Sequence, residues 1–216
     1  MQISVDFHCH TNASRDSQAS PEAVIRFAHM RGLDRLVITD HNTIDGALAA
    51  RTYDPELVII GEEIMTTHGE ILAAYVSHPI PPGLSPKESI KRLRDQEAFI
   101  SVSHPFDSWR SGSWQLEYLL DISSQVDAVE VFNARCMVPN SNLRASRFAM
   151  NNHVAGTAGS DAHAAFEIGH AWLELPPFTN SDELREVITM GKVRGRQSPF
   201  WVHLLSRYAS LRKRVV

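Results

Sequence analysis

The stretch Val5-Asp6-Phe7-His8-Cys9-His10-Thr11 does most to decide how this chain folds and where its chemistry lies. Apolar and polar residues alternate through its first half, and a period of two predicts a β-strand. Side chains two residues apart on a strand point to the same face, so we expect His8 and His10 side by side and Cys9 on the other face. Two neighbouring imidazoles at a strand end provide half of a metal site.

Further apolar runs alternate with amphipathic helical patterns along the chain. Strands are predicted at 2–7, 35–39, 57–63, 70–76, 98–103, 126–132 and 154–158, and helices near 21–31, 44–52, 86–97, 114–121, 140–152 and 181–190. Ser20-Pro21 and Ser85-Pro86 are helix-start signals, because each places a capping residue before a proline at the first helical position. This alternation predicts an α/β fold with a largely parallel sheet covered by helices.

Length and composition exclude several classes of protein. The 216 residues, 43% of them hydrophobic, suit a single globular domain spanning 1–216, and the net charge of -4 does not mark a nucleic-acid binder. Cys9 and Cys136 are too few for a disulfide framework, which favours a reduced, cytoplasmic setting. No stretch approaches the roughly 20 apolar residues of a membrane span. We expect no membrane association, and nothing indicates an obligate protein partner.

Polar and ionisable side chains follow five of the predicted strands. Asp40-His41, Glu62-Glu63, His104, Asn133 with Arg135, and Asp161 with His163 each come after an apolar run. The carboxyl ends of strands converge on one mouth in a β/α barrel, but spread along a crevice in an open sheet. Buried histidines and acids are costly unless they are paired or bind a metal. The pattern therefore favours a barrel whose mouth holds Mn²⁺, Fe or Zn²⁺ in a hydrolytic centre.

Taken together, these segments resemble the PHP family, named for polymerase and histidinol phosphatase domains. The matching segments are Asp6-Phe7-His8-Cys9-His10-Thr11, Ile38-Thr39-Asp40-His41-Asn42, Gly61-Glu62-Glu63-Ile64, Ser103-His104-Pro105-Phe106-Asp107 and Gly159-Ser160-Asp161-Ala162-His163, in the family's order and within residues 3–170. The resemblance implies a distorted seven-stranded, TIM-like β/α barrel. It also implies a metal-dependent phosphoesterase with two or three divalent ions, Mn²⁺, Fe²⁺/Fe³⁺ or Zn²⁺.

The same resemblance assigns ligands to three ions. His8, His10, Glu63 and Asp161 would bind the first, Glu63, Glu70 and His104 the second, and Asp16, His41 and His163 the third. Relatives often have histidine where this chain has Glu70 and Asp16, and His68 is the alternative to Glu70. Glu62 points away from Glu63 on the strand, so we expect it to face solvent or a helix.

Several further residues are candidates for catalysis or substrate binding. Arg135 would bind phosphate oxygens through its guanidinium, with an ordinary salt bridge as the alternative. His163 would protonate the leaving group if the third ion does not occupy it. Arg15 and Asn133 are further candidates for substrate binding. Asp40 is expected either to orient a histidine ligand or to cap the next helix.

The C-terminal segment, residues 191–216, carries seven Lys and Arg residues and no Asp or Glu. With Trp201 and Tyr208 among them, these cations would suit a polyanion such as an oligonucleotide. The apolar residues between Phe200 and Leu211 favour instead a terminal helix that packs on the barrel.

The sequence thus predicts hydrolysis of a small phosphorylated substrate, a phosphomonoester or a nucleotide, by a metal-activated hydroxide. A phosphodiesterase or exonuclease acting on short oligonucleotides is the nearest alternative. An amidohydrolase-like hydrolase and a non-catalytic metal-binding domain are the others. The Asp161-Ala162-His163 sequence favours a phosphoesterase over an amidohydrolase, and the nearly complete ligand set argues against a domain without catalysis.

Overall fold

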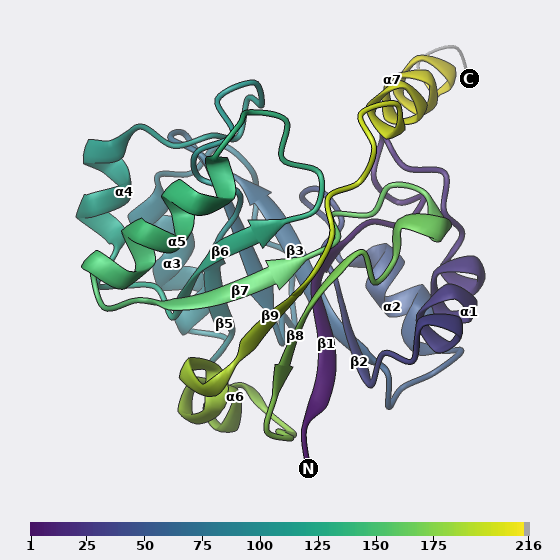
Figure 1. Ribbon diagram of the computed structural model, residues 1–216, viewed down its shortest axis with the longest axis horizontal. Coiled ribbons are helices and arrows are strands. Elements are labelled where there is room, and N and C mark those ends of the chain that lie inside the picture. Colours follow the sequence, from purple (N-terminus) through teal and green to yellow (C-terminus); the bar gives the residue numbers. More distant parts are fainter. Residues whose placement is uncertain (214–216) are drawn as a thin grey trace.

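The computed structural model describes residues 1–213, which form a sheet curled around an apolar interior with helices outside it (Figure 1). The strands are β1 (Ile3–Cys9), β2 (Arg35–Ile38), β3 (Val58–Met65), β4 (Glu70–Ala74), β5 (Phe99–Val102), β6 (Ala128–Asn133), β7 (Ala155–Gly159), β8 (Ala171–Leu175) and β9 (Lys192–Gly195). Their order in the sheet is β7-β6-β5-β4-β3-β2-β1-β8-β9. The helices are α1 (Pro21–Arg31), α2 (Asp45–Arg51), α3 (Pro86–Arg94), α4 (Leu116–Ile122), α5 (Ser141–Asn151), α6 (Ser181–Val187) and α7 (Val202–Arg212), with short 3-10 helices η1 (Ala165–Glu167) and η2 (Ile188–Met190).

The sheet is nearly closed into a barrel because the carboxyl ends of β1 and β7 meet. The amide of Asp161 donates to the carbonyl of His8 (2.6 Å), and the amide of His10 donates to the carbonyl of Ala162 (2.9 Å). A Cβ on Gly159 would lie 2.3 Å from the Cβ of His8, so only glycine permits this approach. The first half of β1 pairs instead with β8, with Val5 opposite Leu173. The barrel therefore closes at the half of β1 that carries the two histidines.

All seven predicted strands are present, but the expectation of a seven-stranded sheet was wrong, because the sheet has nine strands. It is also mixed, since β4 runs antiparallel to both of its neighbours. Strand β8 shows the alternating burial of an amphipathic strand, with Ala171, Leu173 and Leu175 buried. Strand β9 is exposed at every residue, so no apolar pattern marks it in the sequence. These two strands extend the sheet beyond β1.

Helices cover the outside of the curled sheet, with α3, α4 and α5 at one side of the barrel and α1 and α2 at the other (Figure 1). The predicted start signals hold: the Ser20 and Ser85 side chains accept hydrogen bonds from the amides of Ala23 (3.2 Å) and Glu88 (3.3 Å). Both caps satisfy backbone donors that the first helical turn would leave free. No helix in the described part of the chain is both long and apolar enough to cross a bilayer.

The C-terminal helix α7 lies over the carboxyl ends of the strands (Figure 1). Val202 and Ala209 are buried against the barrel, whereas Leu204, Tyr208 and Leu211 are each 59% exposed. The helix therefore packs through one narrow face. Residues 214–216 of the predicted basic segment lie outside the described residues.

Candidate metal centre

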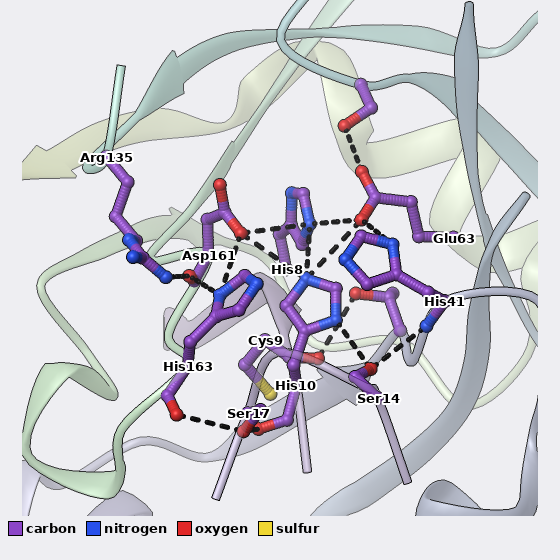
Figure 2. Close-up of polar contacts among 12 residues, drawn as sticks. His8, Cys9, His10, Ser14, Ser17, His41, Glu63, Arg135, Asp161 and His163 are labelled. Atoms are coloured by element: carbon purple, nitrogen blue, oxygen red, sulfur yellow. Dashed lines mark hydrogen bonds and ion pairs between the residues drawn. The ribbon is translucent and has the colours of Figure 1, made fainter. Parts of the chain in front are cut away.

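The mouth of the barrel gathers the imidazoles of His8, His10, His41 and His163 around the carboxylates of Glu63 and Asp161 (Figure 2). His8 and His10 share a face of β1, with their Nε2 atoms 3.1 Å apart. Cys9 points the other way, and its thiol contacts the carbonyl of Val37. The alternation predicted for the opening strand is confirmed.

The first group of side chains has the spacing of a four-coordinate ion. Glu63 Oε2 lies 3.3 Å from His8 Nε2 and 3.4 Å from His10 Nε2, and Asp161 Oδ1 lies 3.5 and 3.3 Å from the same two nitrogens. Ligands of a tetrahedral ion bound at roughly 2.0–2.1 Å are themselves about 3.3–3.4 Å apart. Asp161 Oδ1 is buried and has no hydrogen-bond partner among the described residues, which leaves it free to bind a cation.

The second group shares Glu63 with the first. Glu63 Oε1 lies 3.3 Å from His104 Nε2, and Glu70 Oε2 lies 3.5 Å from the same nitrogen. The two oxygens of Glu63 thus face different imidazoles, as in a carboxylate that bridges two ions. His68 packs instead against the ring of Tyr118, with centroids 3.8 Å apart and the ring planes tilted by 55°. The structure therefore brings Glu70 to the site and leaves His68 outside it.

The third group lies at the outer edge of the mouth. Asp16 Oδ2 lies 3.1 Å from His163 Nε2, and Asp16 Oδ1 lies 3.5 Å from His41 Nε2. The other ring nitrogen of His41 lies 3.1 Å from Glu63 Oε2, the oxygen that also faces His8 and His10, so His41 connects this group to the first one. All nine predicted ligand residues are brought together, in three groups joined through Glu63 and His41.

Burial and mutual charge shift the protonation of these groups strongly. Burial would lower the pKa of His8, but the negative charges of Glu63, Asp161 and Glu130 raise it well above its ordinary value. Burial would likewise lower the pKa of His41, but Glu63 and Asp16 raise it to about 10. In the metal-free protein His41 is therefore charged at neutral pH, and the charges of His8 and His41 hold the pKa of Glu63 well below its usual range against the effect of burial.

Binding of a divalent ion is expected to release protons, because a coordinating imidazole must be neutral. Since the pKa of His41 is about 10 without metal and that of His8 is raised, affinity should rise with pH, by up to about tenfold per pH unit for each proton released. Calorimetric titration with Mn²⁺ in buffers of different ionisation enthalpy, at about pH 6.5 and about pH 8, measures the number of protons. An affinity independent of pH over this range would contradict the assignment.

Carboxylates behind the histidines fix the orientation of the imidazole rings. Of these carboxylates, the sequence predicted Asp40 but not Glu130. Glu130 Oε1 lies 3.0 Å from His8 Nδ1, and both residues are fully buried. Within residues 1–213, Asp40 caps no helix and contacts no imidazole. Its carboxylate accepts a hydrogen bond from the hydroxyl of Ser14 (2.6 Å), and that hydroxyl lies 3.1 Å from His10 Nδ1. Asp40 thus acts on His10 through Ser14. In the sequence, Glu130 is an acidic residue within an otherwise apolar strand, and this position could have indicated a role at the site.

Two of the predictions on polar residues near the site were wrong. Asn133 was expected to bind substrate, but it is fully buried and its amide donates to Glu130 and Asp161, both at 3.0 Å, so it positions those carboxylates. Glu62 was expected to face solvent or a helix. It is buried beneath the loop 77–84, where the amide of Ile80 donates to it (2.8 Å), and burial raises its pKa to about 7.

Two arginines lie at the site, of which sequence reasoning found one. Arg135 is 2% exposed; its Nε lies 3.5 Å from Glu167, and its Nη2 donates to Ser206 of α7 (2.8 Å). The predicted salt-bridge alternative is therefore present, although Arg135 also lines the cleft described below. Arg110, on the loop after β5, donates to Asp161 and to the carbonyl of Arg135. A lone loop arginine gives no sequence signal.

A cleft of about 970 Å³ opens above the metal groups between the barrel mouth and α7. Its lining includes Arg15, Asp16, Trp109, Arg110, His203 and Arg207. Arg15 was predicted to bind substrate, and it is exposed in this lining. His203 of α7 also lies in the cleft, where burial and the charges of Arg135 and Arg110 lower its pKa to about 4. It is therefore neutral at pH 7.

The ammonium of Lys213 holds the loop that carries Asp16. It donates to the carbonyls of Asn12, Ser14 and Ser17, at 2.6, 2.6 and 2.9 Å. Replacement of Lys213 by methionine is expected to weaken divalent binding at Asp16 by about tenfold, because a ligand loses affinity when its support is removed. Metal titration followed by native mass spectrometry measures this. Arg212→Met, at an exposed neighbour, is the matched control, and equal binding by both variants would contradict the role of Lys213.

The chain is similar to known proteins over most of its length. A profile of the PHP domain matches residues 6–95, and a profile of the PHP-associated region matches residues 139–193. The uncharacterized protein MJ1587 of Methanocaldococcus jannaschii is 34% identical over 145 residues, which is 61% of this chain and 82% of that protein.

Solved structures share the fold at lower identity. A two-domain protein from Bacteroides vulgatus, containing a predicted PHP-like metal-dependent phosphoesterase, superposes with a TM-score of 0.73 at 19% identity, covering 91% of this chain. This chain spans 65% of that protein. The lesion-specific endonuclease PfuEndoQ from Pyrococcus furiosus superposes with a TM-score of 0.62 at 16% identity, covering 89% of this chain and 58% of that one. The family profiles and the identity to the archaeal relative together show that the chain belongs to the PHP family.

Proposed function

We propose that this protein is a metal-dependent phosphoesterase. The observation that carries the proposal is the carboxylate of Glu63, which faces His8 and His10 through one oxygen and His104 through the other. Neighbouring ions that share a carboxylate can hold the attacking and leaving oxygens of a displacement at phosphorus on opposite sides. Nitrogen and oxygen donors without a cysteine suit Mn²⁺, Fe or Zn²⁺ in such a centre. The proposed ligands are the nine residues of the three groups.

Divalent ions bound here would polarise the phosphoryl oxygens and lower the pKa of water. Of the chain's own groups, Arg15 is exposed at the cleft and free to bind phosphate oxygens bidentately. Arg110 and Arg135 place positive charge beside Asp161 and stabilise negative charge at the base of the cleft. Both ring nitrogens of His163 have partners, Asp16 and the carbonyl of Asp161. We therefore assign His163 to metal binding rather than to protonation of the leaving group.

A small phosphomonoester or a nucleotide is the substrate we propose first. The cleft gives a specific reason to keep a second candidate, a phosphodiesterase acting on short oligonucleotides. Trp109 and Phe200 are each 66% exposed in the cleft lining, which also includes Arg207. Exposed aromatic rings stack on bases and arginines follow a phosphate backbone, so the cleft has room and chemistry for more than one nucleotide.

Phosphate release from nucleotides, sugar phosphates and bis-(p-nitrophenyl) phosphate in the presence of Mn²⁺ tests the proposal, with His8→Ala as the inactive comparison. Turnover by the wild type that is lost in the variant supports a metal-dependent phosphoesterase. A preference for monoesters or for the diester then separates the two candidates. Metal binding without turnover on any of these substrates would favour a non-catalytic domain or a hydrolase of another bond, such as an amidohydrolase.

A further inference from the structure

A second pocket, of about 390 Å³, lies outside the cleft and shares no lining residue with it. It is formed where the end of α1, the segment around η1 and the residues between β9 and α7 meet. Two guanidinium groups line it, those of Arg31 and Arg196, and none of its lining residues is acidic. Neither arginine lies within salt-bridge distance of a carboxylate among residues 1–213. Two unpaired cations facing one pocket attract an anion.

The polar partners of these arginines are neutral, so their charge is not cancelled locally. Arg31 donates to the carbonyl of Phe166 (3.2 Å), and the Arg196 guanidinium lies 3.4 Å from His170 Nε2. Burial and the two arginines lower the pKa of His170 to about 4, so its ring is an uncharged acceptor at neutral pH. The pocket therefore keeps the full charge of both guanidinium groups for a ligand.

An aromatic surface borders the same pocket. The rings of Phe166 and Trp201 stack with centroids 5.7 Å apart and an interplanar angle of 27°. Trp201 is 51% exposed, so part of its indole is open to a ligand. Exposed aromatic rings stack on the faces of nucleobases, while guanidinium groups bind phosphate bidentately. The pocket volume also lies within the range of small-molecule sites.

We propose that this pocket binds a mononucleotide, with its phosphate between Arg31 and Arg196 and its base against Trp201. The pocket adjoins the wall of the cleft. Glu167 of η1 and Val202 of α7 both contact Arg135, which lines the cleft. Each of them directly follows an aromatic residue of the pocket, Phe166 and Trp201. This binding goes beyond the proposed hydrolysis, and it does not require metal in the mouth.

Calorimetric titration with AMP tests the proposal in a Glu63→Gln background with EDTA, where the metal groups cannot hold phosphate. Saturable binding is expected, weakened at least about tenfold by the double substitution Arg31→Gln with Arg196→Gln. Arg26→Gln, on the same helix outside the pocket, and Arg15→Gln, in the cleft, should leave the affinity within about twofold of the parent. Trp201→Ala should weaken binding and Trp201→Phe should largely retain it.

Three results would overturn the proposal, and none depends on whether the protein is a phosphoesterase. Weakening by Arg15→Gln but not by the double substitution would place AMP in the cleft. If inorganic phosphate displaces AMP with an affinity equal to that of AMP itself, the base contributes nothing to binding, and the proposed contact with Trp201 is wrong. Absence of saturable binding up to about 1 mM AMP would show that the pocket holds no nucleotide with useful affinity.

Discussion

Replacement of Glu63 by glutamine is expected to reduce phosphoester hydrolysis by more than about 100-fold. Substitution of residues that only support a metal ligand costs about 10–100-fold in affinity or activity, and Glu63 lies at the centre of the ligand groups. Its two oxygens face His8, His10, His41 and His104 at 3.1–3.4 Å. Glutamine keeps the shape of the side chain but presents an amide nitrogen, which cannot bind a cation, at one of the two positions. Turnover and metal content of the purified variant measure the effect.

Glu62→Gln is the matched control for this experiment. Glu62 precedes Glu63 on β3 and points away from the mouth. One of its oxygens accepts a hydrogen bond from the amide of Ile80, and the other has no partner in the described part of the chain. Glutamine can still accept that hydrogen bond, so turnover and metal content should match the wild type. Similar losses in both variants would show that a charge on β3, rather than the shared carboxylate, matters for activity.

The control variant also has its own expected dependence on pH. Burial raises the pKa of Glu62 from 4.5 to about 7, so the folded protein holds this proton more tightly than the unfolded chain does. The contribution of protonated Glu62 to the stability of the folded protein is therefore full below about pH 4.5 and is lost as pH rises through 7. Glu62→Gln should make the free energy of unfolding less dependent on pH between these values. An unchanged pH profile would show that Glu62 ionises normally in the folded protein.

The sequence predicted the parts of the fold that depend on local patterns. The seven barrel strands have apolar runs and the helices α1 and α3 have Ser-Pro starts, and both signals are set by residues close together in the chain. The clustering of histidine and acid side chains at one mouth could be predicted for the same reason, whereas the division of the nine ligands into three groups came from the resemblance to the PHP family. His8 and His10, for example, are two residues apart on one strand, so their common direction follows from the strand period alone.

Features that depend on contacts between distant segments could not be predicted in this way. Strand β9 is recruited as an edge strand by β8 although all of its residues are exposed. Asn133 follows a strand as a substrate-binding residue would, but the barrel closure brings Asp161 to its amide and buries it. Arg110 reaches Asp161 from a loop 51 residues earlier in the chain. In each case the partner, rather than the residue itself, decides the role.

Removal of divalent ions is expected to lower the thermal stability of this protein strongly and reversibly. Four carboxylates of the metal groups, those of Asp16, Glu63, Glu70 and Asp161, lie close together in the mouth, the last three of them nearly or fully buried. Burial and the charge of Glu63 raise the pKa of Glu70, which is a sign of repulsion between the two acids in the metal-free protein. Bound cations would offset this repulsion.

The size of the stabilisation follows from linkage between binding and folding. An ion at a concentration 100-fold above its Kd adds about 2.7 kcal/mol to the free energy of unfolding, which corresponds to about 5–10 °C in Tm for a chain of this length. Scanning calorimetry of the wild type with Mn²⁺ and with EDTA measures the difference, and readdition of Mn²⁺ tests reversibility. Glu63→Gln should lose most of the shift, because it removes the ligand that joins the first two groups. Glu62→Gln should keep it. An equal change in Tm in Glu63→Gln and the wild type would place the stabilising ions elsewhere on the protein. Metal binding in the mouth would then contribute nothing to the stability of the fold.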